Sequence, residues 1–232
     1  MNKIVIGEII EKIIGTIIGF TIITGPMFAG KTNMLIAILR KLEAEGKKVQ
    51  VFIPNNDTRI KYDEDGRNKI VSHHSEDEIY TDFKIINVSP TGEEQEEIKR
   101  DLKERKIKHV FFEEAQFFSP SAMIQLIPKL IEMNIKVTLV GLDLDSDRKP
   151  FGVIPFLLKK AEKTHELKAI CRFCRNLAPY TLWIGNTEKI EQKVVGGKRE
   201  YTSVCGPCHD YQNKRPAVLP KTSDLAQFES SL

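Results

Sequence analysis

Eight consecutive residues near the N-terminus have the composition of a loop that binds phosphate. They match the pattern G-x-x-x-x-G-K-[ST] and are Gly25, Pro26, Met27, Phe28, Ala29, Gly30, Lys31 and Thr32. Gly25 and Gly30 allow the backbone to curl so that successive N–H groups face the phosphates of a nucleoside triphosphate. Lys31 can then neutralise the outer phosphates, and the Thr32 hydroxyl is suited to hold Mg²⁺. The pattern predicts a nucleoside triphosphate site.

The four cysteines of the chain form two C-x-x-C pairs separated by 30 residues, namely Cys171 and Cys174, then Cys205 and Cys208. Four thiolates at this spacing are typical of a structural zinc site, in which no coordination position stays open for chemistry. Two disulfides are the alternative and are disfavoured in a reducing cytosol. His209 is an alternative ligand to Cys208. Zinc would join the two ends of a long loop, which we expect to act as a lid over a ligand.

Two adjacent glutamates, Glu113 and Glu114, directly follow the apolar run 107–112. A P-loop enzyme needs a carboxylate near Mg²⁺ at such a strand end. A phosphoryl transferase with a hydroxyl acceptor also benefits from a second carboxylate that takes the proton of that hydroxyl. The pair can divide these two roles; the alternative is that both are exposed acids of a turn.

The elements that must position these residues alternate along the chain. Apolar and β-branched runs predict strands at 20–23, 48–53, 83–88, 107–112 and 135–142. Amphipathic spacing predicts helices at 34–42, 93–106 and 122–133, the last interrupted by Pro128. This order indicates an α/β fold of the P-loop, RecA-like type: a mostly parallel sheet with helices on both faces, plus a small C-terminal zinc-binding domain. Ligands of such sheets bind at the carboxyl ends of the strands.

The boundaries follow from composition. We expect an N-terminal extension at residues 1–18 that forms an amphipathic helix, and a nucleotide-binding domain at 19–168. The zinc-binding domain then spans residues 169–211, and a disordered tail spans 212–232. Residues 55–80 are rich in Asp, Asn, Ser and His and predict a long mobile loop.

Size and charge exclude several classes. A chain of 232 residues can bury one substantial core and carry a small module. The net charge of +3, from 35 basic and 32 acidic residues, lacks the basic excess of a dedicated nucleic-acid binder. The 18 uncharged residues at 13–30 include Pro26 and end in the phosphate loop, which argues against a membrane span. Glu8, Glu11 and Lys12 interrupt any signal-like segment, so we expect a cytosolic protein.

Together these motifs resemble the type II thymidine kinases, a cytosolic and bacterial family with a P-loop core and a zinc-bearing lasso. The resemblance covers residues 19 to about 209. Besides the motifs above it is carried by Asp57-Thr58-Arg59, Ser72-His73, Gln116-Phe117-Phe118, Gly141-Leu142-Asp143, Lys149-Pro150-Phe151-Gly152, Ala169-Ile170, Tyr180-Thr181, Val195-Gly196-Gly197 and Tyr201. It implies transfer of the γ-phosphate of ATP to the 5′-hydroxyl of thymidine, giving dTMP in pyrimidine salvage. It also implies Mg²⁺ with ATP, one structural Zn²⁺ per chain and a cytoplasmic homotetramer, with no nucleic-acid or membrane partner.

The resemblance also implies roles for residues. Glu114 would be the catalytic base and Arg59 would stabilise the transferring phosphoryl group. The eight loop residues would bind ATP together with Asp57, Glu113 and Gln116, and Thr32 and Glu113 would hold Mg²⁺. The nucleoside pocket would be lined by Met27, Phe117, Leu142, Phe151, Thr181 and Tyr201, with the backbone of Gln192, Lys193, Val194, Val195 and Gly196 on the pyrimidine edge. The zinc would lie far from the phosphates, so we expect its loss to weaken nucleoside binding more than ATP binding.

Five positions depart from the family pattern. Glu113 stands for an Asp, Ser146 for a Phe beside the substrate, Trp183 for an Arg, Leu182 for a polar residue and Arg175 for a Gly. Ser146 motivates one alternative, a deoxynucleoside kinase of shifted or broader specificity. Glu113 motivates another, a catalytically weak P-loop protein that binds nucleotide as a sensor. A zinc-ribbon ATPase acting on nucleic acid is a third, although the chain lacks the basic patch it needs.

Overall fold

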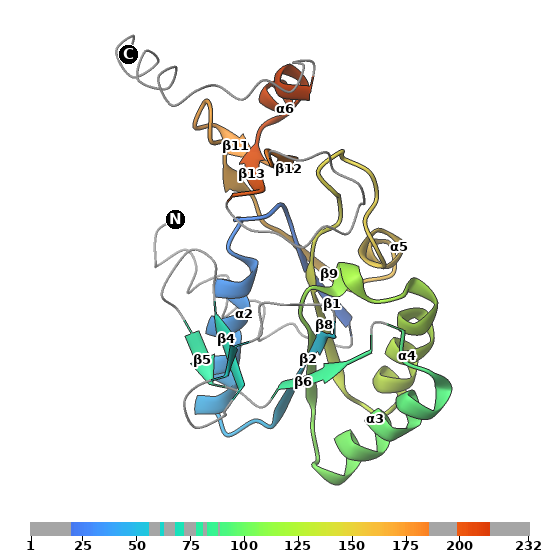
Figure 1. Cartoon of the computed structure of the whole chain (residues 1–232). Helices are drawn as coiled ribbons and strands as arrows, with labels where there is room; N and C mark the ends of the chain where they lie inside the picture. Colours follow the sequence, from blue (N-terminus) through green and yellow to red (C-terminus); the bar gives the residue numbers. More distant parts are fainter. Residues whose placement is uncertain are drawn as a thin grey trace.

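A six-stranded sheet forms the centre of the protein (Figure 1). The computed structural model describes residues 20–55, 61–62, 68–71, 78–80, 83–87, 89–185 and 199–213. The strand order is β6-β2-β7-β8-β1-β9, and every neighbouring pair is parallel. The bounds are β1 Phe20–Thr24, β2 Val49–Pro54, β6 Phe83–Ile86, β7 His109–Phe112, β8 Lys136–Gly141 and β9 Lys163–Glu166.

Helices cover both faces of this sheet, because both faces of its central strands are apolar. Helix α2 (Lys31–Ala44) packs on one face, where its buried side meets alternate strand residues such as Ile23, Val51 and Phe111. Helices α3 (Gly92–Glu104), α4 (Pro120–Glu132) and α5 (Ile154–Leu158) pack on the other face. The predicted α/β class with helices on both faces is confirmed.

A small C-terminal module, defined here as residues 169–185 and 199–213, follows the main sheet. It contains two antiparallel pairs, β10 (Ala169–Ile170) with β11 (Leu177–Ala178) and β12 (Tyr180–Trp183) with β13 (Tyr201–Val204), and ends in α6 (Gly206–Asn213). Figure 1 shows this module above the connection between β1 and α2. The module therefore lies at the carboxyl end of the parallel strands, where the phosphate loop is.

The structure corrects the prediction for residues 55–80. The segments described there include a three-stranded antiparallel sheet of β3 (Lys61–Tyr62), β4 (Asn68–Val71) and β5 (Glu78–Tyr80). A loop without regular structure was the wrong prediction, because short antiparallel strands pair through their backbones and tolerate polar side chains.

The predicted interruption at Pro128 is also wrong, since α4 is continuous through this residue. Pro128 lies on the exposed side of the helix, where water can satisfy the carbonyl group that the ring leaves without a donor. Strand β9 and helix α5 were not predicted. Among the described helices, none is long and apolar enough to cross a membrane.

Other predictions fall partly outside the described residues. The extension at 1–18 and residues 214–232 lie outside them. Helix α6 ends at Asn213 and so passes the predicted boundary at residue 211.

Candidate functional site

The phosphate loop connects β1 to α2, and its backbone needs glycine. Gly25 has φ 136°, and a Cβ atom there would lie 2.2 Å from the carbonyl oxygen of Leu167. Gly30 precedes α2 in the left-handed region with φ 86°. Lys31 folds back over the loop, and its Nζ donates to the carbonyl oxygens of Gly25 (2.9 Å) and Pro26 (2.8 Å). The loop thus has the curled shape and the internal cation that phosphate binding requires.

The end of β7 meets the start of α2. The Thr32 hydroxyl donates to Oε1 of Glu113 at 2.8 Å, and Glu113 is only 5% exposed. These two side chains come from residues 81 positions apart and are the two predicted ligands of Mg²⁺. A hydroxyl and a carboxylate are oxygen donors of the type that Mg²⁺ prefers, so the residues present fit the ion.

Glu114 occupies a strained backbone position at the same strand end. Its φ of 50° lies in the left-handed region, and its carbonyl accepts a hydrogen bond from Phe117 N at 3.0 Å. The Gln116 side chain donates to Oε2 of Glu114 and accepts from Leu142 N at 2.9 Å. Gln116 therefore ties the predicted catalytic carboxylate to the end of β8, and strained residues held in this way cluster at functional sites.

The ends of β1 and β8 are joined as well. The Thr24 hydroxyl lies 3.0 Å from the carbonyl oxygen of Gly141 and 2.8 Å from Oδ1 of Asp143. The carboxyl ends of β1, β7 and β8 thus form one connected rim, which is where α/β sheets bind ligands.

An apolar cluster lies beside this rim. Phe117, Leu142 and Phe151 are buried together, with Met27 packed against them. The Phe117 and Phe151 rings meet edge to face, with centroids 5.8 Å apart and an angle of 87°. All four residues were predicted to line the nucleoside pocket, and the structure brings them together.

Two further predicted pocket residues come from the C-terminal module. The Thr181 hydroxyl oxygen accepts a hydrogen bond from Met27 N at 2.9 Å. Tyr201 is buried with its ring centroid 4.9 Å from that of Trp183. Burial, together with the negative charges of Glu200, Asp145 and Asp147, raises the pKa of Tyr201 to about 12, so its phenol remains a hydrogen-bond donor at neutral pH. The other predicted residues lie outside the described residues: Asp57, Arg59, Gln192, Lys193, Val194, Val195 and Gly196.

The four predicted metal ligands converge. The sulfur atoms of Cys171, Cys174, Cys205 and Cys208 all lie within 4.8 Å of one another, and all four thiols are free. Four sulfurs at about 2.3 Å from a tetrahedral zinc are roughly 3.8 Å apart, so this cluster is the right size for that ion. The disulfide alternative is not what the structure contains. His209 lies outside the cluster, with its Nε2 2.9 Å from the carbonyl oxygen of Ser146.

The thiols of this cluster differ in acidity. Burial alone would raise the pKa of Cys171, but hydrogen bonds from the backbone of Cys174, Cys205 and Phe173 outweigh it and lower this pKa to about 6. Burial and the neighbouring thiols raise the pKa of Cys208. The Cys171 thiolate is therefore available at neutral pH, whereas Cys208 would need a bound dication to ionise.

Sequence reasoning missed the residues that connect the module to the rest of the protein. Ser203 Oγ donates to the carbonyl oxygen of Met27 at 2.7 Å. Arg148, in the loop after β8, donates to the carbonyl oxygen of Gly206 at 2.8 Å, pairs with Asp210 at 2.9 Å and stacks 4.2 Å above the ring of Tyr180. No motif marks Ser203 or Arg148, because their contacts are distant in sequence.

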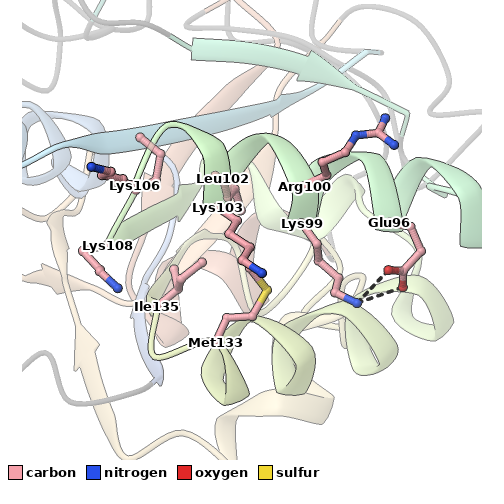
Figure 2. A pocket seen from close by; sticks show the side chains of 10 residues that line it. Glu96, Lys99, Arg100, Leu102, Lys103, Lys106, Lys108, Met133 and Ile135 are labelled. Atoms are coloured by element: carbon pink, nitrogen blue, oxygen red, sulfur yellow. Dashed lines mark hydrogen bonds and ion pairs between the residues drawn. The ribbon is translucent and has the colours of Figure 1, made fainter.

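A basic hollow of about 780 Å³ lies at the opposite end of the sheet (Figure 2). Its lining includes Ile107 and Ile135, which lie just before β7 and β8, together with exposed cations such as Lys103 and Lys106. Lys99 at its edge is paired with Glu96 at 2.8 Å. None of the predicted site residues that the structure describes lines this hollow, so we do not include it in the candidate site.

Strand, phosphate loop and helix, with an acidic strand end beside them and a four-thiol metal site, define a P-loop nucleotide-binding protein with a zinc-binding module. The family model described as thymidine kinase matches residues 18–209. The chain is also 34% identical over 188 residues to a thymidine kinase of Mycoplasma mobile, covering 81% of this chain and 85% of that protein. The chain belongs to the thymidine kinase family and is a kinase.

Among solved structures, the Pif1 helicase of Candida albicans has a TM-score of 0.41 and 13% identity, covering 72% of this chain and 39% of the helicase. A likeness of this extent supports no inference about function.

Proposed function

We propose that this kinase transfers the γ-phosphate of ATP to the 5′-hydroxyl of thymidine and so supplies dTMP for pyrimidine salvage. The observation that carries the proposal is the 2.8 Å contact between Thr32 and Glu113, which joins the phosphate loop to the acidic strand end. Glu114 stands next to this contact, and the apolar cluster of Phe117, Leu142 and Phe151 lies beside it. Phosphate groups, a proton acceptor and a planar apolar ligand can thus be accommodated along one rim.

The phosphate loop would hold the triphosphate. Its N–H groups and Lys31 would face the phosphates, so the contacts of Nζ with Gly25 and Pro26 would be exchanged for phosphate oxygens. Thr32 and Glu113 would hold Mg²⁺, which would supply positive charge to neutralise the phosphate groups.

Glu114 would act as the base. Its carboxylate would accept the proton of the thymidine 5′-hydroxyl while that oxygen forms a bond to the γ-phosphorus. The bond from the γ-phosphorus to the bridging oxygen breaks at the same time, and ADP leaves with the electron pair. The hydrogen bond from Gln116 would keep the Glu114 carboxylate oriented. Arg59 would stabilise the transferring group, and the segment Gln192 to Gly196 would bind the pyrimidine edge.

Several broader features belong to the same proposal. We assign the nucleotide-binding domain to residues 19–168 and the zinc-binding lasso to 169–213, with one Zn²⁺ held by the four cysteines. The protein would work in the cytoplasm as a homotetramer, without a nucleic-acid or membrane partner.

A steady-state assay with ATP, Mg²⁺ and a panel of nucleosides tests the proposal. The expected result is turnover of thymidine with a kcat/KM at least tenfold above those of deoxycytidine, deoxyadenosine and deoxyguanosine. Replacing ATP by a nonhydrolysable analogue should abolish product formation. Binding of ATP without phosphorylation of any nucleoside would instead support the nucleotide-sensor alternative.

A kinase of broader specificity is the second candidate. It is favoured by Ser146, a small residue that is 4% exposed and lies in the loop between Leu142 and Phe151. Comparable kcat/KM values for thymidine and a second deoxynucleoside would support this candidate over a strict thymidine kinase.

A further inference from the structure

The C-terminal module forms two hydrogen bonds with the backbone of one residue of the phosphate loop, Met27. Met27 N donates to Oγ1 of Thr181 at 2.9 Å, and Met27 O accepts from Oγ of Ser203 at 2.7 Å. Thr181 on β12 and Ser203 on β13 are directly opposite each other in the antiparallel pair. Both polar backbone groups of a single loop residue are thus bound by neighbouring side chains of one small sheet.

These two bonds fix the backbone where the loop is most strained. The Met27 N–H belongs to the peptide plane before this residue, and its carbonyl belongs to the plane after it. The next residue, Phe28, has φ 65°, a left-handed conformation that costs energy for any residue other than glycine. Such a conformation persists only where the surrounding contacts determine it, and the two hydroxyls supply contacts immediately before it.

The setting makes both bonds effective. Thr181 is 3% exposed and Ser203 is 4% exposed, so water competes poorly for their hydroxyls. Gly25, at the start of the same loop, packs against the carbonyl of Leu167 so closely that no side chain fits there. The loop is therefore held on the side of the C-terminal module both by close packing and by directed hydrogen bonds.

We propose that Ser203 and Thr181 are positioning residues that hold the phosphate loop in its nucleotide-binding shape, so that ATP affinity depends on the C-terminal module. The inference rests on the proposed ATP site. A hydrogen bond of this kind favours one arrangement over its alternatives by roughly three- to tenfold. Loss of either hydroxyl should weaken nucleotide binding by a factor in this range.

A purely structural role would give a different result. It would lower the stability and the fraction of active enzyme, and so kcat, without moving the dissociation constant for nucleotide in the folded protein. A positioning role moves that dissociation constant and the KM for ATP, with a smaller change in the KM for thymidine. Ser203→Ala is the cleaner variant, because Thr181 is also a predicted pocket residue.

The experiment uses the full chain purified with zinc and four variants: Ser203→Ala, Thr181→Val, Thr181→Ser and Thr202→Val. The measurements are the Kd of a nonhydrolysable ATP analogue with Mg²⁺, by calorimetry, and the KM values for ATP and thymidine. Thr202 is the matched control, since it is buried in the same strand and its side chain points to the opposite face. Ser203→Ala and Thr181→Val should raise the Kd about three- to tenfold. Thr181→Ser, which keeps the hydroxyl, and Thr202→Val should leave the Kd near that of the wild type.

An unchanged Kd in folded Ser203→Ala, or an equal rise in Thr202→Val, would overturn the inference. If Ser203→Ala does not fold, the contrast between Thr181→Val and Thr181→Ser decides it. A wild-type protein that binds the analogue but phosphorylates no nucleoside would refute the proposed function, while the Kd contrast would still decide the inference. A wild-type protein that does not bind the analogue would refute both.

Discussion

The main sheet and the C-terminal module are built on different physical grounds. The sheet buries both of its faces, and Ile22 and Ile23, on opposite faces of β1, are fully buried. The module has a much smaller apolar cluster, and Ile170 and Leu177 on its first hairpin are 56% and 62% exposed. Burial supplies the main stabilisation of a core of the first kind, whereas we expect a module of the second kind to depend on a metal held by its four cysteines.

The two regions also divide the work. The rim of the sheet carries Lys31, Glu113 and Glu114, the groups that would act on phosphate and on a proton in the proposed reaction. The module carries the hydroxyls of Thr181 and Ser203, which bind the phosphate loop, and Asp210, which pairs with Arg148 in the loop after β8. Changes at the rim should therefore remove chemistry and leave the fold intact, while changes in the module should alter folding and affinity.

The largest effect is expected at Lys31. Lys31→Ala removes the only cation of the phosphate loop and no buried apolar contact, so turnover should fall by roughly 10³-fold or more with the fold unchanged. The steady-state assay measures turnover, and circular dichroism measures the fold. Lys103→Ala, at an exposed position on α3, is the control and should keep its activity. Near-normal turnover in folded Lys31→Ala would mean that the loop is not the ATP site.

Substitutions of the two glutamates should lower activity for different reasons. Glu114→Gln keeps the size of the side chain and removes the proton acceptor, so kcat should fall by roughly 10²- to 10⁴-fold while thymidine still binds. Glu113→Gln should act through the metal, so raising the Mg²⁺ concentration should partly restore its activity. Titration of kcat against Mg²⁺ for both variants measures this. Greater damage from Glu113→Gln at saturating Mg²⁺ would reverse the two roles.

The sheet was largely predictable because its signals are local. Buried parallel strands read as apolar runs, and α2 and α3 show helical spacing, so the elements were found to within a few residues. Strand β9 escaped prediction because its four residues, Lys163 to Glu166, are all polar and give no apolar signal at the sheet edge. The continuity of α4 through Pro128 depends on which side of the helix faces water, and that is set by tertiary packing.

The site was predictable in its ligands and not in its connections. The phosphate loop, the acid pair and the cysteines carry spacing that follows from their chemistry. The structure places Thr32 against Glu113 and the four cysteines against one another. The bonds from Met27 to Thr181 and Ser203 span 154 and 176 residues. The local sequence around a serine in a short strand does not indicate which distant group its hydroxyl will bind. Such hydrogen bonds can therefore be identified only once the fold is known.

Cys205→Ser tests the dependence of the module on metal. We expect one Zn²⁺ per chain in the wild type. Loss of one thiolate should reduce the affinity for zinc by roughly 10- to 100-fold or more. Trp183 is the only tryptophan and lies on β12, so its fluorescence reports on the module, while far-ultraviolet circular dichroism reports mainly on the sheet. The fluorescence should change and the helical signal should persist. Wild-type protein purified without chelator that contains no zinc would contradict this assignment.

Cys205→Ser also tests whether zinc loss weakens ATP binding. Zinc loss was expected to affect nucleoside binding more than ATP binding, but Ser203 is two residues from Cys205 and bonds to the phosphate loop. The KM for ATP should therefore rise in Cys205→Ser by about three- to tenfold, as it should on loss of the Ser203 hydroxyl. An unchanged ATP KM beside a raised thymidine KM would restore the original expectation.

The smallest expected effect is a dependence of the free energy of unfolding on pH, caused by one histidine of the main sheet. His109 on β7 is 6% exposed, and burial, reinforced by the charges of Lys136 and Lys47, lowers its pKa to about 4. In the unfolded chain the pKa of histidine is about 6.5, so below that pH the unfolded state binds a proton that the native state refuses. The free energy of unfolding should therefore decrease as the pH falls from 6.5 towards 4, by about 2 kcal/mol at pH 5.

His109→Gln removes this dependence, because glutamine does not titrate. Urea unfolding followed by circular dichroism at pH 7 and pH 5 measures the difference, and the wild type should lose about 2 kcal/mol more than the variant between these two pH values. The comparison uses the difference between pH values and not absolute stability, so any cost of the substitution itself cancels. Burial also lowers the pKa of His209 in the module. Protonation of His209 would change the pH dependence of Trp183 fluorescence. It is the same in both proteins, so it does not alter the difference between wild type and His109→Gln in the circular dichroism signal of the sheet. Equal slopes in the two proteins would mean that His109 accepts a proton in the folded sheet, and the sheet would then lack the tight burial that distinguishes it from the module.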